Sequence, residues 1–190
     1  MLELRTTTPA PWLDTVLADF DAFLIDHAAC ERKASATGMW FVVRYPDRPV
    51  LLEPLIAFAR EELEHFHRVY RVIEQRGLKL GADRKDEYVG RLLRLARNGG
   101  EEHLCDRLLL AGIVEARGCE RFALVADALP AGDLKDMYVD LTRAEARHHG
   151  LFVQLARRLF GDGSVRARLD ELLDAETAIV ASLPFRAAVH

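Results

Sequence analysis

The stretch "REELEHFHR", residues 60–68, holds two overlapping Glu-x-x-His pairs, Glu62 with His65 and Glu64 with His67. Residues three apart on a helix are neighbours, so either pair can place a carboxylate and an imidazole beside one metal ion. Apolar residues recur every three or four positions around the stretch, which predicts a helix with one buried stripe. Glu62 falls within that stripe, whereas Glu64 is turned by about 200° from it. The spacing therefore favours Glu62 and His65 as ligands, and Glu64 and His67 as outward or edge residues.

A second Glu-x-x-His pair, Glu145 with His148, occurs in the helical stretch "RAEARHHG" at 143–150. Two further acids, Glu31 and Glu115, lie in the apolar stripes of two other predicted helices. Glu31 stands 31 residues before Glu62, and Glu115 stands 30 residues before Glu145. Each half of the chain thus has one Glu followed about 30 residues later by Glu-x-x-His, which is the pattern of carboxylate di-metal bundles.

Four carboxylates in a core are costly unless protons, basic partners or cations compensate them. Two divalent ions would balance the four charges, and the neutral imidazoles of His65 and His148 would complete the ligand set. Carboxylates with one imidazole per ion suit iron or manganese better than metals that prefer thiolates. The alternative is that these acids lie at bundle edges and meet arginines in water.

The assignment of Glu115 has a competitor in Glu120. "ACER" at 29–32 resembles "GCER" at 118–121, which would align Glu31 with Glu120. Glu120 is turned by about 140° from Glu115, off the apolar stripe. It also stands only 25 residues before Glu145. We therefore prefer Glu115 as the ligand and interpret Glu120 as a surface or edge charge.

The surroundings of these ligands give weaker indications. His27 lies one turn before Glu31 and Tyr138 two turns before Glu145, so each is a candidate partner behind the ligands, or an ordinary core residue. Small residues flank the ligands, which either leaves room for oxygen and a substrate or allows close helix packing. They are Ala28, Ala34, Ser35, Gly38, Gly112, Gly118 and Cys119.

The whole chain reads as one helical domain over residues 1–190. Half of its residues are apolar and 29% are charged, with a formal net charge of −4. Helical periodicity predicts four long helices near 14–44, 50–76, 101–128 and 131–160, with shorter ones near 83–98 and 165–182. This is a four-helix bundle with a crossover helix and an extra C-terminal helix. No apolar run approaches the roughly 20 residues of a membrane span, and no secretory signal is visible. Three cysteines without CxxC spacing fit a reducing cytoplasm.

Four stretches closely resemble motifs of the bacterial tRNA 2-methylthio-N6-isopentenyladenosine hydroxylases: "LIDHAACERKA" (24–34), "EELEHF" (61–66), "IVEARGCERF" (113–122) and "RAEARHHGLF" (143–152). The resemblance implies an all-α, ferritin-like four-helix bundle that holds two iron ions through Glu31, Glu62, His65, Glu115, Glu145 and His148. It also implies a monooxygenase that hydroxylates the isopentenyl group beside the anticodon of tRNA, with O₂ as co-substrate and an external ferredoxin or reductase as electron donor. Better-known enterobacterial members have His where this chain has Glu64, and are longer between the first two helices.

A local excess of basic residues is a candidate RNA contact. Between Arg68 and Arg97 there are nine Lys or Arg against four acids. Such a patch can neutralise the phosphates of an anticodon stem-loop, although a solvated helical face has the same composition. The candidates are Arg84, Lys85, Arg91, Arg94 and Arg97.

Three other functions fit the same helical pattern. An iron-storage or iron-oxidising protein would share the bundle and its ligands, and so would a peroxide-scavenging di-iron or dimanganese protein. A metal-free helical interaction protein would share the bundle alone. The sequence leaves the oligomeric state open.

Overall fold

Residues 2–190 are described by a computed structural model, and every regular element within them is a helix. In chain order the helices are α1 (Ala10–Ala18), α2 (Phe20–Arg44), α3 (Pro49–Gln75), α4 (Glu87–Leu93), α5 (Gly100–Ala128), α6 (Asp133–Phe160) and α7 (Asp162–Ser182). The all-helical prediction is thus confirmed. Across the described residues, none of the helices combines the length and hydrophobicity needed to cross a membrane.

The chain divides into two compact units. Residues 14–84 and 186–189 form the first, here called the α2–α3 unit. Residues 2–13, 85–185 and 190 belong to the second, here called the α4–α7 unit. The single domain expected over 1–190 stays a prediction.

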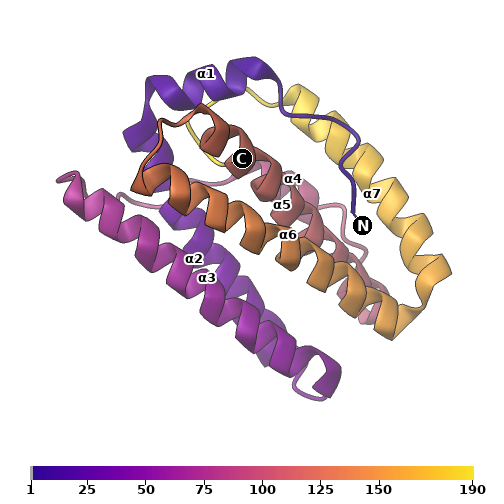
Figure 1. The fold of residues 1–190 in the computed structure, drawn as a ribbon. Helices are drawn as coiled ribbons and strands as arrows, with labels where there is room; N and C mark the ends of the chain where they lie inside the picture. Colours follow the sequence, from indigo (N-terminus) through magenta and orange to yellow (C-terminus); the bar gives the residue numbers. More distant parts are fainter. Residues whose placement is uncertain (1) are drawn as a thin grey trace. The chain divides into compact units, whose positions relative to one another are not determined.

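In the α2–α3 unit the two long helices pack side by side (Figure 1). The short connection at 45–48 returns the chain, so the helices run antiparallel. A Cβ atom at Gly38 would lie 2.8 Å from Cδ1 of Phe58 and 3.1 Å from the carbonyl oxygen of Leu55. One turn earlier, the Ser35 hydroxyl donates a hydrogen bond to the carbonyl oxygen of Ala59 at 2.7 Å. At these two positions the small residues serve close helix packing.

The first predicted helix, near 14–44, is wrong at its start, because two helices occupy that range. The break is at Asp19, whose backbone is non-helical at φ −138° and ψ 65°. Its carboxylate accepts a hydrogen bond from the backbone N–H of Ala22 at 3.2 Å and so caps α2. Apolar periodicity continues through a break of one residue, which is why the sequence pattern does not reveal it.

In the α4–α7 unit, α5 and α6 pack along each other (Figure 1). A Cβ atom at Gly112 would lie 3.3 Å from the carbonyl oxygen of His149, so a larger residue there would require the two helices to shift slightly apart. Helix α4 covers only Glu87–Leu93, shorter than the predicted 83–98. Asp86 caps its start by accepting from the backbone N–H of Val89 at 2.9 Å.

The chain after α4 is held by a buried carboxylate, Asp106 on α5, which is fully inaccessible. Asp106 accepts hydrogen bonds from the backbone and side chain of Arg97 at 2.8–3.0 Å. It also accepts two from Arg168 of α7, at 2.9 and 3.0 Å. Burial alone would raise the pKa of Asp106, but the bonds from Arg97 and Arg168 outweigh it and lower the pKa to about 2. One acid therefore ties the loop after α4 and helix α7 to α5.

A second buried network joins α4, α5, α7 and the N-terminal segment. Arg117 donates to Glu176 at 2.8 and 3.0 Å, and the hydroxyl of Tyr88 donates to the same carboxylate at 3.0 Å. Arg117 also pairs with Glu120. Glu120 in turn accepts from the backbone N–H and the hydroxyl of Thr8 at 2.6 and 2.7 Å. Glu120 is half-buried, and its carboxylate holds Thr8 of the N-terminal segment against α5.

Candidate metal centre

The α2–α3 unit contributes a buried half-site made of Glu31, Glu62 and His65. Their relative exposures are 3%, 0% and 4%. Nδ1 of His65 lies 3.7 Å from Oε2 of Glu31 and 3.6 Å from Oε2 of Glu62. The imidazole on α3 therefore faces one carboxylate from each helix of the pair. The helical spacing produces this arrangement, since residues 62 and 65 lie one turn apart on the buried face of α3.

His27 lies directly behind Glu31. Its Nε2 is 2.6 Å from Oε1 of Glu31, and the imidazole is fully buried. The two residues are four apart on α2, so the histidine holds one carboxylate oxygen and leaves Oε2 facing His65. This geometry suits a partner that orients a ligand, and that role of His27 stays a prediction.

Ionisation in this half-site follows from burial and opposite charge. Burial alone would raise the pKa of Glu31, but its hydrogen-bonded partner His27 and the nearby imidazole of His65 outweigh it and hold the pKa well below its ordinary value. Burial likewise favours neutral His65, yet Glu31 and Glu62 outweigh it and raise the pKa of His65 to about 10. Without a metal, the half-site thus draws a proton to compensate its two carboxylates.

The α4–α7 unit contributes a matching half-site of Glu115 from α5 with Glu145 and His148 from α6. Their relative exposures are 7%, 3% and 3%. Nδ1 of His148 lies 3.8 Å from Oε2 of Glu145, close to the spacing of the His65–Glu62 pair. Each unit therefore buries the same set of groups, two carboxylates and one imidazole.

Both half-sites suit a divalent cation by their donors and spacing. Within each half-site the three ligand atoms lie within 4.8 Å of one another. Two atoms that each bind an ion at about 2.1 Å are at most about 4.2 Å apart. The N–O separations of 3.6–3.8 Å fall inside that limit but are too long for direct hydrogen bonds. Oxygen-rich sets with one imidazole suit iron or manganese.

Tyr138, the other expected partner, is fully buried on α6. Its ring packs edge-on against Phe122 of α5, with centroids 5.7 Å apart. Its carbonyl oxygen accepts a hydrogen bond from the hydroxyl of Thr142 at 2.8 Å. These contacts belong to the packing of α5 on α6, so a role for Tyr138 behind Glu145 stays a prediction.

The competing pair of the opening stretch lies elsewhere. Glu64 and His67 are both exposed, on the side of α3 turned away from Glu62. Glu120, the competitor of Glu115, binds Thr8 and Arg117 instead.

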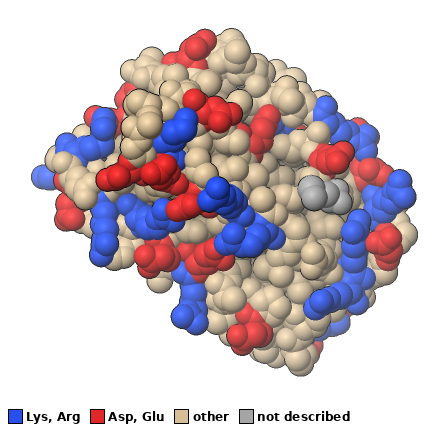
Figure 2. Space-filling model, viewed as in Figure 1, with Lys and Arg blue, Asp and Glu red and all other residues tan. Residues whose placement is uncertain are grey.

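The five basic residues expected to contact RNA lie in different surroundings. Arg97 is engaged by Asp106 and Glu102, and Arg91 pairs with Glu87 and donates to the hydroxyl of Ser182 at 2.8 Å. Arg84, Lys85 and Arg94 are exposed. On the face drawn in Figure 2, basic and acidic side chains intermingle rather than forming one basic area. RNA contact by these residues stays a prediction.

Asp106, the partner of Arg97, was not predicted from the sequence. Its signal is an acid between Cys105 and Arg107 in a segment otherwise rich in leucine, because an acid on a buried helix face needs a partner.

Comparison with known proteins connects this geometry to a family. The family described as "tRNA-(MS[2]IO[6]A)-hydroxylase (MiaE)" matches residues 2–190. A tRNA 2-(methylsulfanyl)-N(6)-isopentenyladenosine(37) hydroxylase of Pseudomonas putida is 36% identical over 172 residues, covering 90% of this chain and 83% of the relative. The enzyme of the same name from Salmonella typhimurium is 31% identical over 137 residues, covering 72% of this chain and half of that protein.

One solved structure resembles the chain as a whole. It is a Synechococcus protein with aldehyde deformylating oxygenase activity, with a TM-score of 0.92 and 37% sequence identity. The match covers 97% of this chain and 92% of that one. With the seven helices, it confirms the predicted all-α, ferritin-like fold.

Proposed function

Because this chain belongs to the MiaE family of tRNA hydroxylases, we propose that it hydroxylates the isopentenyl group of 2-methylthio-N6-isopentenyladenosine beside the anticodon of tRNA. The observation that carries the proposal is the family match over residues 2–190, supported by the two curated relatives of that name. The reaction converts a C–H bond to C–OH. It consumes O₂, two electrons and two protons, and releases one water.

In this proposal, two iron ions are held by the two half-sites: Glu31, Glu62 and His65, and Glu115, Glu145 and His148. Support comes from the burial of all six side chains and the matched composition of the half-sites. Two divalent ions also offset four buried carboxylates, which are otherwise costly. When bound, the iron supplies the redox chemistry that activates O₂.

Residues of this chain orient the metal-binding side chains, bind and release a proton, and exclude water. His27 fixes Oε1 of Glu31 at 2.6 Å, which leaves Oε2 directed toward His65. His65 would bind an ion as the neutral base, so a bound ion would take the place of the proton that Glu31 and Glu62 draw to this imidazole. The burial of both half-sites excludes bulk water from the ligands.

Two electrons per turnover come from an external donor of the ferredoxin or reductase type. The half-sites consist of carboxylates and imidazoles, and none of these side chains can supply the two electrons. With tRNA as the substrate, we expect the enzyme to work in the cytoplasm.

The test is a nucleoside analysis. Iron-loaded protein is incubated with tRNA that carries the unhydroxylated nucleoside, O₂ and a reductant, and the digested nucleosides are examined by mass spectrometry. We expect the isopentenyl nucleoside to gain the mass of one oxygen atom, and of the heavy isotope when ¹⁸O₂ is used. An intact di-iron centre that leaves the nucleoside unchanged would overturn the proposal.

The likeness to the Synechococcus protein makes aldehyde deformylation a second candidate. The two functions separate in parallel reactions with the same protein and reductant. A long-chain aldehyde that loses its carbonyl carbon, with modified tRNA unchanged, would favour the second.

A further inference from the structure

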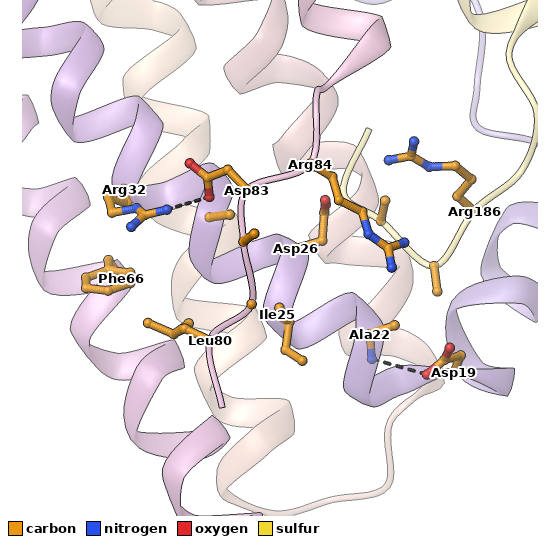
Figure 3. A pocket seen from close by; sticks show the side chains of 15 residues that line it. Asp19, Ala22, Ile25, Asp26, Arg32, Phe66, Leu80, Asp83, Arg84 and Arg186 are labelled. Carbon is orange, nitrogen blue, oxygen red and sulfur yellow. Dashed lines mark hydrogen bonds and ion pairs between the residues drawn. The ribbon is translucent and has the colours of Figure 1, made fainter. Parts of the chain in front are cut away.

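A pocket of about 680 Å³ lies wholly within the α2–α3 unit (Figure 3). One face of α2 forms its floor, from Asp19 to Arg32. Phe66 of α3, the segment 80–84 and the segment 186–188 complete its walls. The pocket adjoins the half-site in sequence, because Arg32 follows Glu31 and Phe66 follows His65.

Two cations in this pocket are available to a ligand. Arg32 is paired with Asp83. The side chains of Arg84 and Arg186, by contrast, form no hydrogen bond or ion pair with any residue in 2–190. Figure 3 shows their guanidinium groups on the same side of the segment 80–84, with Phe66 and Leu80 on the other side.

The acids of the pocket are already engaged. Asp83 binds Arg32, and Asp19 caps α2 at Ala22. Oδ2 of Asp26 accepts from the backbone N–H of Val189 at 2.8 Å and from the thiol of Cys30. The two unpaired guanidinium groups are therefore the part of the lining that can receive an anion, and two guanidinium groups match a phosphate in particular.

The rest of the lining is apolar. Ala22, Ile25 and Ala29 recur at three- and four-residue spacing along α2 and form one stripe. Phe66 is half-buried, and Leu80 is 39% exposed. Two free guanidiniums beside an apolar wall fit a ligand with a phosphate and a flat, partly apolar body, which describes a nucleotide.

We propose that this pocket binds a nucleotide of the tRNA that flanks the modified adenosine. Its phosphate contacts Arg84 and Arg186, and its base lies against the apolar stripe of Ala22, Ile25 and Ala29 on α2. The inference rests on the proposed function, since a bound tRNA supplies phosphates and bases next to the adenosine being modified.

The test measures binding of a fluorescent anticodon stem-loop RNA by anisotropy, at several salt concentrations, with the iron-loaded full chain. The variant is Arg84→Gln/Arg186→Gln. The matched control is Arg44→Gln/Arg60→Gln, which removes two exposed arginines of the same unit. Arg44 lies twelve residues beyond Arg32, about 18 Å along α2. Circular dichroism melting checks that both variants fold.

We expect the pocket variant to raise Kd about tenfold or more. Its slope of log K against log salt should become shallower by about 0.7, because one phosphate contact to single-stranded RNA contributes about 0.7. Under turnover, KM should rise while kcat at saturating RNA stays near that of the unaltered protein. The control should retain Kd, slope and KM.

The possible outcomes distinguish a failure of the pocket inference from a failure of the proposed function. If the unaltered protein hydroxylates tRNA but the pocket variant keeps its Kd, slope and KM, the pocket inference fails alone. An equal loss in the control variant also refutes it. If adenosine monophosphate binds the pocket with the same dependence on Arg84 and Arg186 while RNA binding is unaffected, the occupant is a free nucleotide and the inference is wrong. If the unaltered protein neither binds nor hydroxylates tRNA, the proposed function itself fails.

Discussion

Glu115 and Glu120, five residues apart on α5, offer a matched test of the metal assignment. Both are acids on one helix, and short motif similarity points to either one. The structure gives them different surroundings, because Glu115 lies with Glu145 and His148 while Glu120 binds Thr8 and Arg117. We predict that Glu115→Gln loses iron without a large loss of stability. Glu120→Gln should keep its iron but lose stability.

The cost of Glu120→Gln follows from its three accepted hydrogen bonds. Oε1 accepts from the Thr8 backbone, while Oε2 accepts from the Thr8 hydroxyl and from Arg117. An amide –NH₂ at either position faces at least one fixed N–H donor, so at least one charge-assisted bond is lost. That loss costs about 2 kcal/mol. At about 2–4 °C per kcal/mol for a chain of this size, the melting temperature should fall by about 4–8 °C.

Glu115→Gln instead replaces a ligand oxygen with a neutral group of the same shape. Changes to residues behind a metal ligand weaken binding by about 10- to 100-fold. Loss of the ligand itself should therefore exceed about 100-fold. The metal-free variant should melt within a few degrees of the unaltered protein, because no cavity forms and a buried charge is removed.

The assay has two readouts for each variant: iron per chain by plasma mass spectrometry after reconstitution and desalting, and the melting temperature of the metal-free protein. A full iron complement in the Glu115 variant would show that Glu115 is not a ligand. Iron loss in a folded Glu120 variant would move the ligand to Glu120 and refute the helical-phase reasoning.

Three further outcomes are expected. Burial alone would raise the pKa of Asp106, but its two arginine partners lower it from 3.8 to about 2. The ionised Asp106 should thus contribute about 2 kcal/mol to the free energy of unfolding above pH 4, and this contribution should disappear as the pH falls toward 2. In urea unfolding at several pH values, Asp106→Asn should lose this acid-dependent part, and an unchanged pH profile would exclude the effect. Gly38→Ala should destabilise by about 1–3 kcal/mol, since its Cβ would meet a ring carbon at 2.8 Å. Gly118→Ala, with nothing within 4 Å, should be neutral or stabilising by up to about 1 kcal/mol, and equal melting temperatures would contradict this contrast. His65→Ala should lose iron while exposed His67→Ala keeps it, as measured by iron content.

Much of the fold was predictable because helical periodicity is a local property of the chain. The long helices after residue 49 lie close to their predicted ranges. The errors fall where single contacts override periodicity. The Asp19 cap divides the first predicted helix in two. The hydrogen bond from Arg97 to Asp106 accompanies an end of α4 earlier than predicted.

By itself, the sequence determined which acids and histidines share a buried helix face, since a turn of about 100° per residue separates Glu62 from Glu64 without knowledge of any neighbour. Only the tertiary structure decided which residues the arginines contact. Arg97 and Arg84 both looked like surface cations. The fold engages the first with a buried Asp106 and places the second with Arg186 at a pocket. The physical reason is that these contacts join different segments of the chain, because such contacts depend on how the helices and loops pack rather than on local helical geometry.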